Sequence, residues 1–329
     1  MLRRLAIFLF LAANGLFGLA DEPFARSIPY PDFRDAILLH GFYANTAWTE
    51  KFYDSLDARY VSFFEQIYRR QIERARSEPV KSQVRIPRKI HQIWLGGEVP
   101  EKCKEWMATW QNLEGWEYKL WTEKDLKDFP MYNRDLFNSI TNYGEKSDIL
   151  RLEILHRFGG VYVDTDLTCI KPQWLEELHR DFDFYIAVEP LTHGVINKYY
   201  MFKFCNAIMA STPGHSLMEA LCQNIAASYY AYLHLRVVQR TGPAYITRII
   251  CEYELQGAHD QRNIYLPCTF FYPFPVSQEK DYFADPVRAA ETIPETIGIH
   301  YWMGSWREKT FPKESPSYEA DSHKLPNRD

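Results

Sequence analysis

Two aspartates separated by one residue, Asp164 and Asp166, carry the clearest chemical signal in this sequence. A helical pattern ends at two glycines, residues 159–160. A short apolar strand (161–163) follows, and both carboxylates come where that strand ends. In an extended segment, residues i and i+2 point the same way, and in α/β proteins ligands bind at the carboxyl ends of strands. We therefore expect the two carboxylates to converge on a divalent cation and the anion that it carries.

The surrounding sequence alternates short apolar runs with helical patterns from residue 88 onward, which is typical of an α/β domain. The expected strands are residues 89–94, 116–121, 161–163, 184–188 and 297–302, and the expected helices are 101–113, 144–158, 214–235 and 242–255. Glu189 follows one of these strands and could reach the reacting centre, although a loop carboxylate without a role in the reaction is the simpler interpretation. A second acidic triplet (181–183) opens a strand, and we interpret it as solvated surface.

Composition limits the class of protein. The 329 residues, 46% hydrophobic and 25% charged, favour one domain of roughly 230 residues with extensions over two equal domains. The net charge of −5 and the lack of a long basic run argue against a nucleic-acid partner. Six scattered cysteines without a Cys-x-x-Cys pair argue against structural zinc, leaving disulfides or buried free thiols open.

The two ends of the chain differ from the domain. Arg3 and Arg4 precede an uncharged stretch, 5–20, that ends in small residues and is shorter than the ~20 residues that span a bilayer. Residues 1–20 are expected to be a signal peptide of an exported protein, or alternatively a short membrane anchor. Residues 21–86 are expected to be a helical extension and linker, 87–306 the domain and 307–329 a polar tail.

Apolar positions recur at mostly three- or four-residue steps between residues 47 and 76 within the extension. This spacing predicts one or two amphipathic helices. Docking on the domain is the default expectation, with a partner or a membrane surface as alternatives.

Seven short motifs, in this order and spacing, resemble family 32 of the glycosyltransferases, the sugar-binding DXD-motif group. That family includes mannosyltransferases and is related to the large glucosylating toxins. The motifs are Ile-His-Gln-Ile-Trp-Leu-Gly-Gly (90–97), Tyr-Lys-Leu-Trp-Thr (118–122), Ser-Asp-Ile-Leu-Arg (147–151), Gly-Gly-Val-Tyr-Val-Asp-Thr-Asp (159–166), Asn-Ala-Ile-Met-Ala-Ser-Thr-Pro-Gly-His (206–215), Thr-Gly-Pro (241–243) and His-Tyr-Trp-Met-Gly-Ser-Trp (300–306). The resemblance implies a GT-A-type fold, a single nucleotide-binding α/β domain around a mostly parallel sheet, and a nucleotide-sugar donor.

The resemblance also implies a metal site. Asp166 is expected to ligate the ion directly, Asp164 to contact the donor ribose or the ion through water, and His300 to approach from the far side. Neutral histidine suits Mn²⁺ better than Mg²⁺, so Mn²⁺ is the expected ion and Mg²⁺ the alternative. Without the resemblance, His300 would be interpreted as a hydrogen-bonded core residue.

The remaining implied roles concern the donor. The residues implied to bind it are Trp94 (stacking on the base), Asp148 and Arg151 (gripping the sugar), Tyr162 (nearby), Asp164, and Ser305 with Trp306 (closing over the leaving group). We expect Asp164, Asp166 and Arg151 to be the catalytic residues. Simpler interpretations remain: Trp94 as core, Tyr162 as a structural hydroxyl, and the Asp148–Arg151 pair as a surface ion pair.

The resulting hypothesis is a metal-dependent, retaining glycosyltransferase that moves mannose, glucose or galactose from a UDP- or GDP-sugar to a glycan, lipid or protein acceptor. Retention comes from the family alone and implies front-face displacement, in which the leaving phosphate deprotonates the acceptor. One alternative is a haloacid-dehalogenase-like, Mg²⁺-dependent phosphatase in which Asp164 is the nucleophile and Asp166 the acid, although that motif normally opens its domain. The other is an inactive sugar- or nucleotide-binding protein. The N-terminal segment could add membrane association.

Overall fold

A mostly parallel sheet forms the centre of the protein. The computed structural model describes residues 26–39, 56–191, 193, 202–257, 260–275 and 285–304. Among these residues, six strands form one sheet in the order β2 (Glu117–Trp121), β1 (Lys89–Ile93), β3 (Gly160–Val163), β6 (Phe204–Ser211), β5 (Phe184–Val188) and β7 (Asn263–Leu266). Neighbouring strands pair in parallel except at β6, which runs antiparallel to both β3 and β5. This arrangement confirms the predicted α/β fold with a mostly parallel sheet.

A second, two-stranded ribbon stands beside the main sheet. It pairs β4 (Leu167–Cys169) antiparallel with β8 (Gly298–His300), and α4 (Glu101–Gln111) contacts β4. Because β4 starts one residue after Asp166, the ribbon continues directly from the acidic motif.

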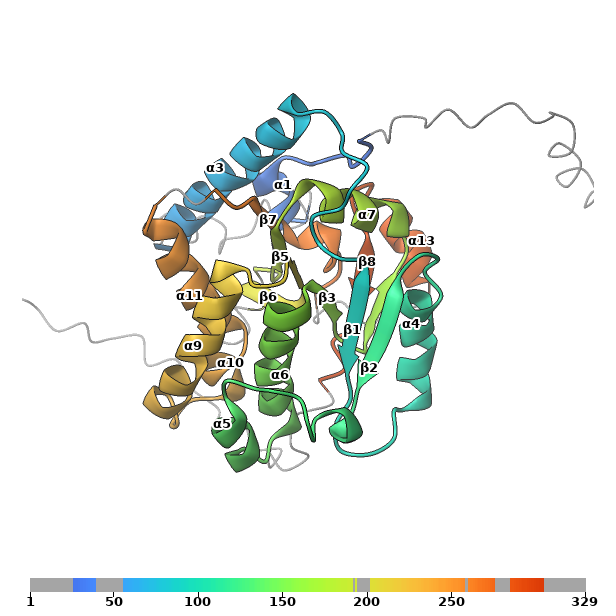
Figure 1. The fold of residues 1–329 in the computed structure, drawn as a ribbon. Coiled ribbons are helices and arrows are strands. Elements are labelled where there is room, and N and C mark those ends of the chain that lie inside the picture. The colour runs from blue at the N-terminus through green and yellow to red at the C-terminus, as the bar shows by residue number, and fades with distance from the viewer. Residues whose placement is uncertain are drawn as a thin grey trace, which may run out of the picture.

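Helices surround the sheet (Figure 1). The long helices are α6 (Tyr143–Phe158), α7 (Pro172–Asp181), α9 (Ser216–Ala231) and α11 (Pro243–Leu255), and the short ones are α1 (Phe33–Ile37), α5 (Arg134–Ser139), α10 (Val237–Arg240), α13 (Pro286–Glu291) and the 3₁₀ turns η1 (Glu123–Asp125) and η2 (Cys268–Phe270). Helix α6 contacts β1, β3 and β6, and α9 packs on α6 and α11. The side chain of Asn142 caps α6, and Gly159 ends it with φ 61°.

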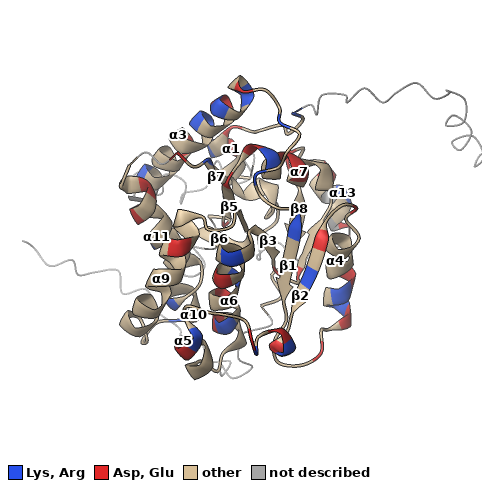
Figure 2. Cartoon of the chain, viewed as in Figure 1, with Lys and Arg blue, Asp and Glu red and all other residues tan. Residues whose placement is uncertain are grey.

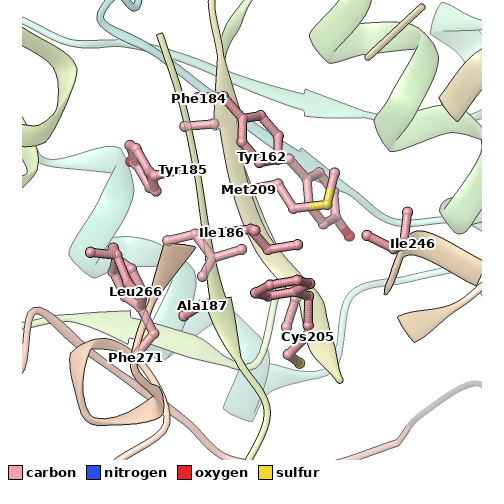
Figure 3. Packing of buried hydrophobic residues seen from close by; sticks show 14 of the residues in the cluster. Tyr162, Phe184, Tyr185, Ile186, Ala187, Cys205, Met209, Ile246, Leu266 and Phe271 are labelled. Atoms are coloured by element: carbon pink, nitrogen blue, oxygen red, sulfur yellow. The ribbon is translucent and has the colours of Figure 1, made fainter. Parts of the chain in front are cut away.

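The centre of the sheet is apolar on both faces. All residues of β5 and β6 are buried, and Figure 3 shows Ile186 of β5 close to Met209 of β6, its partner in the ladder. A strand covered on both faces shows a continuous buried run instead of alternation. All six cysteines are buried and free, so the free-thiol alternative is correct.

The N-terminal extension docks on the domain. Its helix α3 (Leu56–Ser77) buries Val61, Phe64 and Tyr68 and contacts β7. Arg26 makes a two-pronged ion pair with Asp181, with distances of 2.8 and 3.0 Å. These contacts agree with the default expectation that the extension packs on the domain.

Several sequence expectations lie outside the described residues: the targeting segment, the first part of the amphipathic pattern (47–55) and the polar tail. Within the described part, no helix has the length and apolar character needed to cross a membrane.

Candidate active site

The two aspartates and the distant histidine meet at the end of β3. Asp164 directly follows β3, while the ladder of the ribbon places Leu167 opposite His300 and so brings the histidine beside Asp166. His300 Nε2 lies 3.1 Å from Asp166 Oδ1 and 4.0 Å from Asp164 Oδ2. One ligand atom from each residue lies within 4.8 Å of the other two. The sequence-predicted metal set therefore converges as expected.

This donor set fits a divalent cation. Asp166 Oδ2 accepts a hydrogen bond of 2.8 Å from the backbone N–H of Met303, which orients the carboxylate so that Oδ1 meets His300. Burial alone would lower the pKa of His300, but the charge of Asp166 and the hydrogen bond raise it above its usual value. Burial alone would raise the pKa of Asp166, but His300 and the Met303 amide hold it below its usual value. Carboxylate and imidazole thus favour a charged pair here, at a position where a cation with oxygen and nitrogen ligands would take the place of the histidine proton.

Asp164 is the most accessible of the three, with 27% of its side chain exposed. Its Oδ1 accepts a 2.5 Å hydrogen bond from the hydroxyl of Tyr162 and a 3.2 Å bond from Arg151 Nη1. Burial, together with the neighbouring charge of Asp166, raises the pKa of Asp164, while Arg151 opposes that rise. One oxygen is thus anchored to the protein, and Oδ2 is the oxygen nearer His300.

Arg151 is buried, with 6% of its side chain exposed, so the surface ion-pair interpretation is wrong. Its Nη1 also donates to the carbonyl of Asn206 at 2.6 Å, and its Nε and Nη2 donate to the carbonyl and hydroxyl of Ser147 at 3.2 Å each. The guanidinium lies 4.4 Å from the centre of the Tyr162 ring. These contacts make Arg151 a rigid support for Asp164.

Asp148 completes the network on the same helix. It lies 3.2 Å from Arg151 Nη2 and accepts hydrogen bonds of 2.8 Å from Asn206 Nδ2 and from Thr241 Oγ1. Burial raises the pKa of Asp148 to about 6, and its contacts with Arg151 and the two donors limit the rise. Asp148 is therefore contacted by the first residue of each of two sequence motifs, 206–215 and 241–243, to which no role had been assigned.

Trp94 lies at the same edge of the sheet because β1 is parallel to β3 and ends at residue 93. Its half-buried side chain packs against Trp106 and Met107 of α4. The indole Nε1 is buried and has no hydrogen-bond partner within the described residues. Stacking on a donor base stays a prediction for Trp94. Ser305 and Trp306 lie outside the described residues.

Comparison with known proteins identifies the family. The family model described as "Capsular polysaccharide synthesis protein" matches residues 43–237. The chain belongs to that family. The model of the "Alpha 1,4-glycosyltransferase conserved region" matches residues 210–321 of this capsular polysaccharide synthesis family member, and both matches confirm the resemblance to glycosyltransferase family 32.

Individual relatives share less than 30% sequence identity with this chain. The chain is 28% identical over 182 residues to inositol phosphoceramide mannosyltransferase 1 of Schizosaccharomyces pombe, covering 52% of this chain and 53% of that protein. It is 26% identical over 163 residues to lactosylceramide 4-alpha-galactosyltransferase of Mus musculus, covering 47% of this chain and 40% of that protein. The chain thus spans about half, or less, of the length of these relatives. The solved PaToxG glycosyltransferase superposes with a TM-score of 0.43 at 16% identity, covering 60% of this chain and 78% of that one.

Glu189 is a buried carboxylate at this edge of the sheet, in the loop that follows β5. It follows β5, is 8% exposed, and its Oε1 lies 2.9 Å from His193 Nδ1 and 3.7 Å from Lys203 Nζ. Burial alone would raise the pKa of Glu189, but Lys203 and His193 lower it to about 2. The ring of His193 packs against the ring of Trp302, and the Trp302 ring lies 4.1 Å from that of His300. Two ring contacts therefore connect the Glu189–His193 pair to His300. The position of Glu189 at a strand end was the available signal.

The second acidic triplet is not solvated surface, which corrects the sequence interpretation. Asp181 is 4% exposed and pairs with Arg26, and Asp183 pairs with Arg85 at 3.0 Å. These carboxylates hold the N-terminal extension and the linker against the domain.

Proposed function

We propose that this chain is a metal-dependent, retaining hexosyltransferase that uses a UDP- or GDP-sugar as donor and a glycan or lipid as acceptor. The observation that carries the proposal is the convergence of Asp164, Asp166 and His300 at the end of β3. Family membership supports glycosyl transfer, and the relatives named as a mannosyltransferase and a galactosyltransferase support a hexose. The acceptors in the names of these relatives, inositol phosphoceramide and lactosylceramide, support a glycolipid or related glycan.

The three ligands provide two carboxylate oxygens and one imidazole nitrogen, which suits Mn²⁺ better than Mg²⁺. When bound, such an ion supplies Lewis-acid stabilisation of the negative charge that develops on the departing nucleoside diphosphate. The backbone N–H of Met303 fixes the carboxylate of Asp166, and the other oxygen of that carboxylate fixes the ring of His300. Asp164 Oδ2, 4.0 Å from His300 Nε2, would complete the set of ligands.

The donor sugar would lie beside Asp148 and Arg151. Their hydrogen bonds to Asn206 and Thr241 fix both side chains before any substrate arrives, which lowers the entropy cost of binding. Trp94, at the end of the neighbouring strand, is the proposed platform for the base.

Retention would follow from displacement on the front face of the sugar. The acceptor hydroxyl oxygen forms the new glycosidic bond as the bond from the anomeric carbon to phosphate breaks, and the hydroxyl proton passes to the leaving phosphate. Retaining hydrolases instead use a carboxylate nucleophile. Glu189 is paired with His193 and Lys203, so we assign it no covalent role in this proposal.

A screen of donor hydrolysis with Mn²⁺ across UDP- and GDP-sugars tests the proposal. We expect one nucleotide class to be hydrolysed and the same free nucleotide to raise the melting temperature only when Mn²⁺ is present. The double variant Asp164→Asn/Asp166→Asn should lose both effects and keep its fold.

The second acidic triplet provides a matched control. Asp181→Asn/Asp183→Asn removes two carboxylates of the same spacing that come before β5, at the opposite end of the sheet from Asp164. This variant should lower stability and leave donor hydrolysis unchanged. Turnover of para-nitrophenyl phosphate by the unmodified chain, without donor hydrolysis, would favour the phosphatase instead. Nucleotide binding without hydrolysis of any donor would favour an inactive binding protein.

A further inference from the structure

The end of α9 exposes large apolar and aromatic side chains. Tyr230 is 59% exposed and Leu233 is 52% exposed, while Tyr229 and Tyr232 are half-buried. The buried side of α9 is formed by Leu217, Met218, Leu221, Cys222, Ile225 and Ser228. At 3.6 residues per turn, Tyr230 lies on the side opposite these residues. The core therefore does not explain why Tyr230 and Leu233 are apolar.

The same stretch carries no acidic residue. Between residues 220 and 251 the sequence contains no Asp or Glu but contains Arg236, Arg240 and Arg248, in a chain whose net charge is −5. Figure 2 shows the end of α9 and α10 without acidic colour. The guanidinium of Arg240 lies 5.4 Å from the ring of Tyr229, and that of Arg248 lies 4.5 Å from the ring of Tyr232. We call Tyr229, Tyr230, Tyr232, Leu233 and Arg236 the α9–α10 patch.

The patch is linked to the candidate active site through α6. The hydroxyl of Ser228 donates a 2.8 Å hydrogen bond to the carbonyl of Arg240. The side chain of Arg240 in turn forms a 2.6 Å ion pair with Glu145 of α6. The next residue, Thr241, holds Asp148. Figure 1 accordingly shows the end of α9 and α10 beside α6. The segment that follows the patch therefore contacts the helix that carries Asp148 and Arg151.

We propose that the α9–α10 patch rests on the surface of an anionic lipid bilayer. Tyr and Arg have an apolar body and a polar tip, which is the combination found at the boundary between lipid and water. Arg236 is exposed within the patch, whereas Arg240 is paired with Glu145 and Arg248 is half-buried against Ser228. An exposed arginine beside aromatic side chains is attracted to anionic headgroups. Docking would hold the candidate active site near acceptors that are carried by the membrane. This benefit rests on the proposed function, but the docking of the patch does not depend on it.

A local probe tests this proposal in the full chain. Leu233→Cys, labelled with an environment-sensitive fluorophore, reports burial of the patch, and Leu255→Cys, at a site 67% exposed at the end of α11, is the matched control. The six native cysteines are buried, so labelling is directed to the new thiol. A local readout also separates the patch from any membrane contact made elsewhere in the chain.

With vesicles of phosphatidylcholine and phosphatidylglycerol, emission from position 233 should shift to the blue, and emission from position 255 should not. Vesicles of phosphatidylcholine alone should give a smaller shift. Raising the salt concentration from 0.1 to 1 M shortens the screening length from about 10 to about 3 Å, so it should reverse most of the shift, as should Arg236→Gln. No shift at 233, an equal shift at 255, or a vesicle-independent shift that grows with protein concentration would each overturn the proposal. The last result would identify a second copy as the occupant.

Donor hydrolysis separates this proposal from the proposed function. Tyr230→Ser/Leu233→Ser should lose vesicle binding at the patch and hydrolyse the donor at the unmodified rate, because neither residue contacts the Asp148–Arg151 network in the structure. Absence of hydrolysis in the unmodified chain, with the vesicle-dependent shift retained, would refute the enzyme and leave the docking surface.

Discussion

Tyr162→Phe provides the sharpest test of how the site is built. The hydroxyl of Tyr162 donates a 2.5 Å hydrogen bond to Asp164, while its ring packs under the guanidinium of Arg151. Phenylalanine keeps the ring and removes only the donor. Tyr162 is 1% exposed, so water cannot readily replace the lost bond.

The size of the expected effect follows from the charge of the Asp164 carboxylate, which accepts this hydrogen bond. A hydrogen bond to a charged group contributes about 1.5–3 kcal/mol, which is the expected loss in the free energy of unfolding. If the same loss falls on the transition state for donor hydrolysis, 1.36 kcal/mol per factor of ten gives a decrease in kcat/KM of about 10- to 150-fold. The assays are urea unfolding and Mn²⁺-dependent hydrolysis of the donor found in the screen.

Tyr265→Phe is the matched control. Tyr265 is fully buried in β7, and its hydroxyl donates a 2.6 Å hydrogen bond to Glu254, so the same chemistry is lost at the far edge of the sheet. We expect a similar loss of stability and an unchanged kcat/KM. Equal losses of kcat/KM in the two variants, or full activity in Tyr162→Phe, would refute the view that the Tyr162 hydroxyl positions Asp164 for catalysis.

Two further predictions concern a buried histidine of β1 and the hydroxyl that holds Asp148. Burial lowers the pKa of His91 from 6.5 to about 4, so the unfolded chain binds more protons in this range, and stability should be complete above pH 6.5 and fall by ~3 kcal/mol toward pH 4. His91→Gln should flatten this part of the pH dependence of the urea midpoint, and an unaltered slope would contradict the assignment. Thr241→Val removes the hydroxyl that donates to Asp148 but keeps the shape of the side chain, and the loss of about 1 kcal/mol should raise the donor KM about fivefold. An unchanged KM would show that Asp148 does not need Thr241.

The local parts of the site could be predicted from the sequence. The pattern of a helix, two glycines, a short strand and two aspartates fixes the end of β3, because each step depends on neighbouring residues. The contact between Thr122 and Asp125, three residues apart, is equally local: Asp125 Oδ2 accepts hydrogen bonds of 2.9 Å from the backbone N–H and from the hydroxyl of Thr122.

Non-local pairings could not be foreseen in the same way. Strands β4 and β8 have three residues each and are separated by more than a hundred residues, so no periodicity indicated that they pair. Strand β6 was missed because it is buried on both faces and shows no alternation of apolar and polar residues. The spacing of Asp148 and Arg151 fits an exposed pair as well as a buried one, and only the distant Asn206 and Thr241 decide between them.

The ribbon of β4 and β8 has a consequence for how the protein holds together. Asp166 and His300 are 134 positions apart along the chain, and the ribbon of β4 and β8 that brings them together is separate from the six-stranded sheet. A cation held between them acts as a reversible cross-link that closes a long loop, much as a disulfide would. Chelation should therefore loosen the ribbon while the sheet stays folded, and a growing polypeptide cannot complete its catalytic centre until its last strand has been made.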